Sequence, residues 1–213
     1  MADPKPFAKY NSVDMIPDTM TFGLSYNTQI STSPLNGSIK TVQLPGARWS
    51  ARLSYTNLSE DETNTLLAWL SSLNGMAGRF TMYDFSHPAT KNGVTAGTVN
   101  NVASAGGLNV VTFSSLTGGE LEVGDLFTLQ PLSPYVGEKE LKIVVGKTDG
   151  LNYTVEPEFR RPISYYAVTA IGVGSTALCR MMLTSDDQAE KAVQSKIYLG
   201  AVTIECTEQF YNE

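Results

Sequence analysis

Alternation of apolar and polar residues predicts β-strands through the first part of the chain. In residues 48–55 every second residue is apolar, which is the period-two pattern of a strand with one buried face. Two further strands are predicted at Met20–Ser31 and Ile39–Leu44, with turns at the SPLNG and PG sequences that follow them. Residues 1–18 contain three prolines and no periodicity, so we expect an irregular arm that needs a neighbour to become ordered.

One helix is predicted over Glu60–Leu73. Ser59 and Glu62 match the S-x-x-E capping box, and the acidic first turn suits the positive end of the helix dipole. Gly75 is placed to end the helix in the left-handed conformation. The stripe of apolar residues at helical spacing is expected to pack on a sheet through Leu66, Trp69, Leu70 and Leu73.

From residue 95 onward the chain consists of short β-rich runs separated by Gly, Ser, Asn or Pro turns. No helix of useful length fits there, and the pattern predicts a small antiparallel barrel or sandwich whose last strand is Ala177–Leu183. Residues 184–196 are polar and loop-like, and a final strand is predicted within Ile197–Phe210.

Composition places the chain among globular proteins, because 42% of its 213 residues are hydrophobic and 17% are charged. A formal net charge of −6 disfavours a protein built to bind phosphate backbones. The acidity is concentrated in residues 184–213, which carry 2 basic and 6 acidic residues, whereas residues 1–94 carry 7 of each. The most apolar stretch, Tyr165–Leu183, is interrupted by glycine and arginine, so we expect no membrane helix, and Met1–Asp18 lacks the continuous hydrophobic core of a signal peptide.

Residues able to carry chemistry are sparse. Cys179 and Cys206 fit neither a disulfide framework nor zinc spacing and are expected to be buried. His87 is the single histidine, and the nearby Asp84 permits a triad, but no nucleophile motif accompanies it. We predict an exposed or locally bonded turn histidine. The sequence therefore assigns no catalytic, cofactor-binding or metal-binding residue and predicts that the protein is not an enzyme.

Two adjacent tyrosines, Tyr165 and Tyr166, follow Arg160 and Arg161 and could form a stacking platform for bases or sugars. Adjacent strand residues point to opposite faces, so we instead expect one tyrosine to be buried and the other exposed.

A specific order of elements runs through most of the chain. The tryptophan-bearing strand RWSARLSY leads to the capped helix LSEDETNTLLAWLSSLNG, and the strand GRFTMYD follows through Gly78. Later come GDLFTL at Gly124–Leu129 and NYTVEPEF at Asn152–Phe159. This order, from about Ile39 to Leu183 plus the last strand, resembles distal tail proteins of long-tailed, non-contractile bacteriophages. The two later runs are similar to the inserted barrel of that family's short members.

The resemblance implies a mainly β fold with one packed α-helix and a split first domain. Residues 1–94 plus 184–213 would form a ring-forming β-sandwich or barrel-like core with helix 60–73, and residues 95–183 an inserted barrel of the oligonucleotide/oligosaccharide-binding (OB) type. OB-type folds support many uses, so the label alone implies no ligand.

The implied function is structural. In this family six copies close into a ring at the tail tip of the virion, which joins the tail tube to the tail-tip hub or fibre and leaves a channel for DNA. The implied partners are other copies of the chain, the tail tube protein and the hub or fibre protein, without stable nucleic-acid binding or membrane insertion. The chain would be made in the cytoplasm of the host bacterium.

The alternative is a carbohydrate-binding module of a phage tail or host-recognition apparatus, with a cell-surface saccharide as its partner. That function would need exposed aromatic residues on a concave face of the barrel.

A ring around exiting DNA should have an acidic or neutral wall, because cations there would grip phosphates. We expect some carboxylates of the acidic final segment to line or approach the opening, the alternative being a solvated loop on the outer rim. The carboxylates concerned are Asp186, Asp187, Glu190, Glu205 and Glu208.

Overall fold

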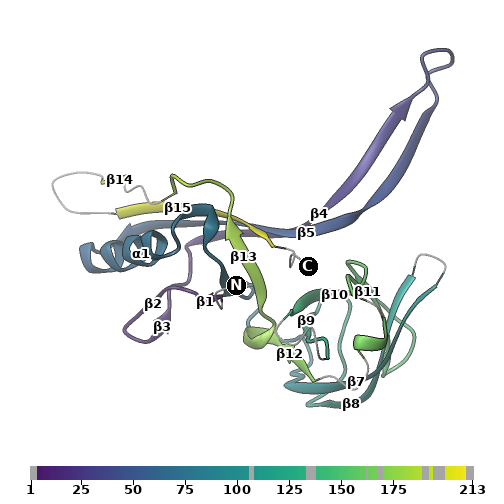
Figure 1. Ribbon diagram of the computed structural model, residues 1–213. Helices are drawn as coiled ribbons and strands as arrows, with labels where there is room; N and C mark the ends of the chain where they lie inside the picture. The colour runs from purple at the N-terminus through teal and green to yellow at the C-terminus, as the bar shows by residue number, and fades with distance from the viewer. Residues whose placement is uncertain are drawn as a thin grey trace.

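Strands dominate the fold of this chain (Figure 1). The structure, a computed structural model, describes residues 4–105, 108–132, 138–161, 163–166, 170–188, 192–193 and 200–209. Within these residues the strands form a seven-stranded sheet, a six-stranded sheet and a two-stranded hairpin, and one α-helix accompanies them. The prediction of a mainly β fold with one packed helix is confirmed.

The seven-stranded sheet brings the early and late parts of the chain together. Its strands follow the order β1-β6-β13-β15-β5-β4, and β14 pairs with β15 off this path. β1 is parallel to β6, and the other pairs are antiparallel. The bounds are Lys5–Pro6 (β1), Thr19–Thr32 (β4), Ile39–Leu58 (β5), Phe80–Met82 (β6), Cys179–Leu183 (β13), Ala192–Val193 (β14) and Gly200–Glu208 (β15).

The long pair β4–β5 extends far beyond the rest of this sheet as a hairpin (Figure 1). Its register shifts where Pro45, Gly46 and Ala47 lie opposite Tyr26. Gly46 has φ 107°, which glycine adopts readily, and proline cannot donate to the ladder. The predicted turn at the PG sequence is therefore wrong: these residues form a bulge inside one continuous strand.

The six-stranded sheet curls into a nearly closed barrel. Its order is β12-β9-β10-β11-β8-β7, and a bridge between Thr98 and Ala170 brings the two end strands together. Fully buried residues inside it include Phe113, Phe127 and Tyr153. The bounds are Ala96–Ala105 (β7), Leu108–Thr117 (β8), Leu126–Leu129 (β9), Glu140–Lys147 (β10), Asn152–Glu156 (β11) and Ile171–Val173 (β12), with 3-10 turns at Ile163–Tyr165 (η2) and Gly174–Thr176 (η3).

The strand β13 corrects one predicted boundary. Sequence analysis assigned Ala177–Leu183 to the inserted segment 95–183, but β13 pairs with β6 on one side and with β15 on the other. Its inward side chains, Cys179, Met181 and Leu183, belong to the core under the seven-stranded sheet. Short β-rich runs look alike in sequence, and only the hydrogen-bonded register shows which sheet a strand joins.

Helix α1 spans Glu60–Ser72 and begins with the predicted capping box. The Glu62 N–H donates to Ser59 Oγ at 3.3 Å, and the Ser59 N–H donates to Glu62 Oε2 at 2.9 Å. The left-handed conformation starts at Asn74, with φ 55°, and continues at Gly75, so the predicted terminator lies one residue later than the first left-handed residue. A 3-10 turn, η1 (Gly75–Ala77), follows.

The buried face of α1 differs from the prediction at Trp69. The three leucines of that face, Leu66, Leu70 and Leu73, are at most 2% exposed, but Trp69 is only half-buried. Its indole Nε1 donates to the carbonyl of Pro6 at 3.0 Å, and its ring centroid lies 4.9 Å from that of Phe7.

The N-terminal arm is thus ordered by its own chain. After β1, Phe7 and Ala8 are buried against the core, and β2 (Lys9–Tyr10) pairs with β3 (Val13–Asp14) as a small hairpin.

Replacing Trp69 with alanine should lower the free energy of unfolding by about 3 kcal/mol, the low end of the range for buried tryptophans, because the ring is half-buried. Limited proteolysis should also cut the arm faster, since the Pro6 contact is lost. Asn64→Ala, on the exposed face of α1, is the matched control and should change stability by less than about 0.5 kcal/mol in urea unfolding. Equal stability of both variants would contradict the packing described.

Candidate functional site

The Asp-Ser-His turn at residues 84–87 does not form a catalytic relay. His87 Nδ1 lies 2.9 Å from Asp84 Oδ2 and 2.9 Å from Ser86 Oγ. A hydrolytic triad uses one ring nitrogen for the acid and the other for the serine, whereas both partners here share one nitrogen. The His87 side chain is 72% exposed, and Asp84 also accepts from the Ser86 N–H, as in an Asx turn. His87 is the locally bonded turn histidine that was predicted.

Other predicted features have structural explanations. Tyr166 is fully buried and Tyr165 is half-buried, but they lie at the end of η2 rather than in a strand, so the sheet alternation used to predict them does not apply. Asp186 Oδ1 accepts from the Met76 N–H at 2.7 Å, which ties its loop to η1.

Among the residues that the structure describes, no group of three or more His, Cys, Asp or Glu side chains is arranged to hold a metal ion. The described helical segments include none long and apolar enough to span a bilayer.

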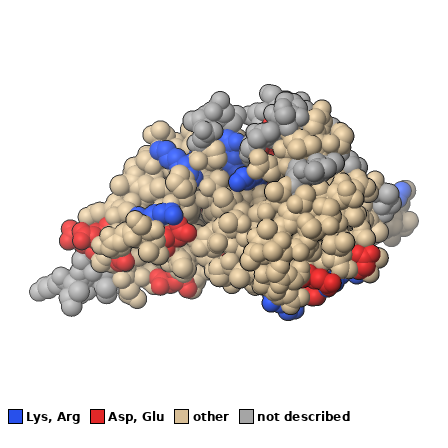
Figure 2. All heavy atoms as spheres, turned by 90° about the horizontal axis from the view of Figure 1, so that it is seen from below, with Lys and Arg blue, Asp and Glu red and all other residues tan. Residues whose placement is uncertain are grey.

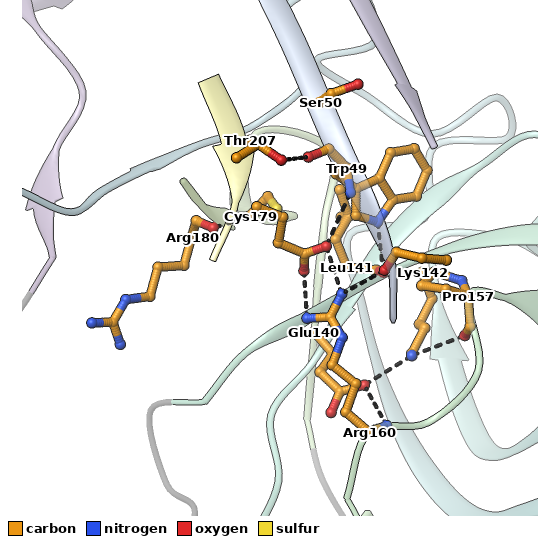
Figure 3. Close-up of polar contacts among 12 residues, drawn as sticks. Trp49, Ser50, Glu140, Leu141, Lys142, Pro157, Arg160, Cys179, Arg180 and Thr207 are labelled. Atoms are coloured by element: carbon orange, nitrogen blue, oxygen red, sulfur yellow. Dashed lines mark hydrogen bonds and ion pairs between the residues drawn. The ribbon is translucent and has the colours of Figure 1, made fainter. Parts of the chain in front are cut away.

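The carboxylate of Glu208 is the centre of a buried junction between the two sheets, and its partners Arg160 and Trp49 are labelled in Figure 3. The Glu208 side chain is 2% exposed and receives Arg160 Nη1 at 2.7 Å and Nη2 at 2.6 Å, a two-point ion pair. The Trp49 N–H donates to the same carboxylate at 3.1 Å. Glu208 lies on β15, and Arg160 follows β11 of the barrel, so one ion pair connects the two sheets.

Burial of Glu208 overturns part of the prediction for the acidic segment. This carboxylate is enclosed and neutralised by Arg160 and therefore cannot line an opening. Glu205 lies on the exposed face of the same strand and forms a 3.5 Å ion pair with Arg52. Glu190 lies outside the described residues.

A second buried ion pair lies on the barrel side of the junction. Lys142 Nζ is fully buried, 2.8 Å from Glu140 Oε2, and also donates to the carbonyls of Pro157 and Glu158. Tyr166 donates its hydroxyl to Glu140 Oε1. Burial by itself raises the pKa of Glu140, but Lys142 and Tyr166 outweigh it, and the pKa lies below its usual value.

The indole of Trp49 completes this connection. Its Nε1 donates to the carbonyl of Leu141 on β10 at 3.0 Å, and its ring stacks on Phe22 with centroids 5.0 Å apart. Trp49 on β5 thus contacts the barrel through its indole and Glu208 through its backbone. The junction residues therefore hold the base of the β4–β5 hairpin against the barrel.

A cavity of about 430 Å³ opens beside the junction. The bulge residues 45–47 line one side, and residues 157–161 with Glu138 and Glu140 line the other. Arg161 Nε binds Glu138 at 2.7 Å, and Arg160 and Glu140 have the buried partners described above. Four charged residues of this cavity, Glu138, Glu140, Arg160 and Arg161, are therefore engaged in ion pairs.

Beyond the bulge, β4 and β5 form an exposed two-stranded segment, residues 26–44, which we call the ribbon. β15 pairs with β5 only between Ser50 and Leu58, so within the described residues neither outer edge of the ribbon has a strand partner. The ribbon carries exposed large apolar side chains, led by Leu35 at its tip, which is 96% exposed. The others are Tyr26, Ile30, Ile39, Val42 and Leu44.

The charge of this hairpin also differs from that of the whole chain. Residues 19–58 contain Lys40, Arg48 and Arg52 and no acidic residue, although the chain carries a net charge of −6. An exposed, apolar and cationic strand pair is a surface suited to a partner rather than to water. Sequence analysis did not identify this surface, although the absence of acidic residues from residues 19–58 can be read from the sequence.

No protein-family model matches this chain, and comparison with curated proteins finds no significant match.

Replacing Glu208 with glutamine should lower the free energy of unfolding by about 3–5 kcal/mol, because the buried Arg160 guanidinium loses its counter-ion. Glu205→Gln, three residues earlier on the same strand, breaks only an exposed ion pair and should cost at most about 1 kcal/mol. Urea unfolding measures both. A Glu208 variant as stable as the Glu205 variant would contradict the structural importance of the junction.

Neither native thiol should react in the folded protein. Burial raises the pKa of Cys206 to about 12 and that of Cys179 well above its usual value, so the reactive thiolate is suppressed at pH 8. An aromatic disulfide reagent should titrate both thiols only after unfolding. A Leu35→Cys variant should show one fast-reacting thiol, and fast reaction of the unmodified chain would contradict the burial.

Proposed function

We propose that this chain is a structural ring component of a bacteriophage tail tip, which joins the tail tube to the hub or fibre around a channel for DNA. The sequence resemblance to distal tail proteins supplies the class. The observation that carries the proposal is the ribbon, because it supplies a surface for assembly.

A two-stranded hairpin without further strands or a packed face is marginally stable in water. The ribbon nevertheless presents six large apolar side chains to solvent, and its edges offer backbone groups for pairing. In a chain that assembles, a partner can cover such an element. In a chain that stays monomeric, the same element would only promote aggregation.

The buried junction also supports a structural role. The Arg160–Glu208 ion pair and the Trp49 indole fix the barrel against the sheet that carries the ribbon. A subunit whose two sheets are held in a fixed arrangement can keep a neighbouring tail component aligned with the ring. The proposal includes the barrel as the OB-like insertion of the family and gives no residue a catalytic, cofactor-binding or metal-binding role.

Most described aromatic residues of the barrel do not favour the carbohydrate-binding alternative. Phe113, Phe127, Tyr153 and Tyr166 are at most 1% exposed, so they present no face on which a sugar could stack, and the remaining two, Phe159 and Tyr165, are half-buried.

The purified chain should form a closed ring, with a mass near six times 23.0 kDa if the family stoichiometry applies. Light scattering after size exclusion gives the mass, and negative-stain images give the symmetry. A variant in which residues 26–44 are replaced by Asn-Gly, which leaves a five-residue connection between Ser25 and Arg48, should fold and remain monomeric. A wild-type chain that stays monomeric or forms a two-fold dimer at high concentration would refute the proposal.

A further inference from the structure

We propose that the ribbon of one copy binds a groove at the opposite end of the β4–β5 hairpin on the next copy. This inference rests on the proposed ring and names the surface that receives the ribbon. The groove, which we call the arm groove, encloses about 350 Å³ between the N-terminal arm and the start of α1. Tyr10, Val13, Asp14, Ile16, Leu58 and Glu62 line it.

The arm groove has the apolar character that the ribbon requires. Val13 is 65% exposed and Ile16 is 62% exposed, and both lie beside the half-buried Leu58 at the end of β5. These are among the most exposed large apolar residues of the described chain outside the ribbon. Two apolar surfaces that are exposed on the same chain can be covered together by one contact between copies.

The ribbon carries apolar residues on both of its faces. In the antiparallel register Val42 is paired with Gln29 on one face, and Ile30 is paired with Thr41 on the other. The groove of about 350 Å³ has room for a few of these apolar side chains and not for the whole strand pair, so the ribbon would insert part of its apolar surface into it.

The charges of the two surfaces are opposite. The ribbon carries Lys40 and no acid, whereas the end of the molecule that carries α1 shows several acidic side chains together with lysine or arginine (Figure 2). Asp14 and Glu62 line the groove, and Lys9 pairs with Asp14 at 3.4 Å. Nearby exposed acids are Asp18, Glu60 and Asp61. The acidic rim favours a cationic ribbon and repels nucleic acid.

The ribbon cannot occupy the groove of its own chain. Leu58 in the groove and Thr32 near the ribbon tip stand at opposite ends of the hairpin (Figure 1). The 14 residues of β4 alone span roughly 45 Å at the usual strand rise. Another chain must therefore supply the occupant, and a second copy is the one that carries the complementary ribbon. A head-to-tail contact of this kind closes into a ring when its rotation divides the circle.

Two variants with complementary defects test this pairing. The double variant Ile30→Asp, Val42→Asp places charges on the apolar surface of the ribbon and leaves the groove unchanged. The double variant Val13→Lys, Ile16→Lys places charges in the groove and leaves the ribbon unchanged. All four side chains are more than half exposed, so both variants should fold, which circular dichroism checks. If the lysine variant fails to fold, Val13→Ser with Ile16→Ser replaces it. Val123→Asp, at a 57% exposed barrel residue, is the control and should still form rings.

Each variant alone should be monomeric, and their equimolar mixture should give a heterodimer of twice 23.0 kDa and nothing larger, because only one intact ribbon meets one intact groove. Light scattering after size exclusion measures these masses. Wild-type rings together with a mixture that stays monomeric, or a groove variant that still forms rings, would overturn the pairing and leave the ring proposal standing. A monomeric wild-type chain would overturn both.

Discussion

A carboxylate removed from water must be paired, and the burial of Glu208 imposes this requirement on the centre of the molecule. Its partner, Arg160, lies in the connection between β11 and β12 of the barrel, so satisfying one charge fixes two sheets against each other. The Trp49 backbone N–H donates to the same carboxylate, and its indole reaches Leu141 on β10. The half of β5 that continues into the ribbon therefore starts from a fixed base.

The ribbon, in contrast, has large apolar side chains that no other part of the described chain covers. The barrel and the seven-stranded sheet each enclose a cluster of buried apolar side chains, whereas every large apolar side chain of residues 26–44 is exposed and the strand edges there are unpaired within the described residues. The Pro45–Ala47 bulge separates the covered part of the hairpin from the ribbon, because β15 pairs with β5 only from Ser50 to Leu58, on the side of the bulge away from the ribbon. A well-packed body that carries an uncovered strand pair is consistent with a subunit whose packing is completed by assembly.

These two features together support the proposed structural role. The polar groups at the junction are engaged in holding the fold, as Arg160 with Glu208 and Lys142 with Glu140 illustrate. The His87 turn brings serine, histidine and aspartate together but uses one ring nitrogen for both contacts. The proposed tail-tip ring uses the remaining surface, which is apolar and cationic on the ribbon and acidic around the arm groove.

The sequence by itself determined those features that depend on the spacing of residues over a few positions. The capping box at Ser59, the helix to Ser72 and the alternating face of Trp49 to Tyr55 all follow from contacts within a few residues. The burial of both cysteines was also predictable from their apolar strands.

The tertiary structure alone decided the contacts between residues distant in sequence. β13 joins the seven-stranded sheet because its ladder bonds match β6 and β15, and short β-rich runs do not reveal their partners. Trp69 packs on the arm, and Pro45–Gly46 forms a bulge rather than a turn, because Pro6 and β4 happen to lie opposite them. Glu208 looked like a surface acid in an acidic segment, and only the arrival of Arg160, 48 residues earlier in the chain, made it the buried centre of the junction. Local pattern sets the elements, whereas charge pairing and strand register over long sequence separations set their assembly.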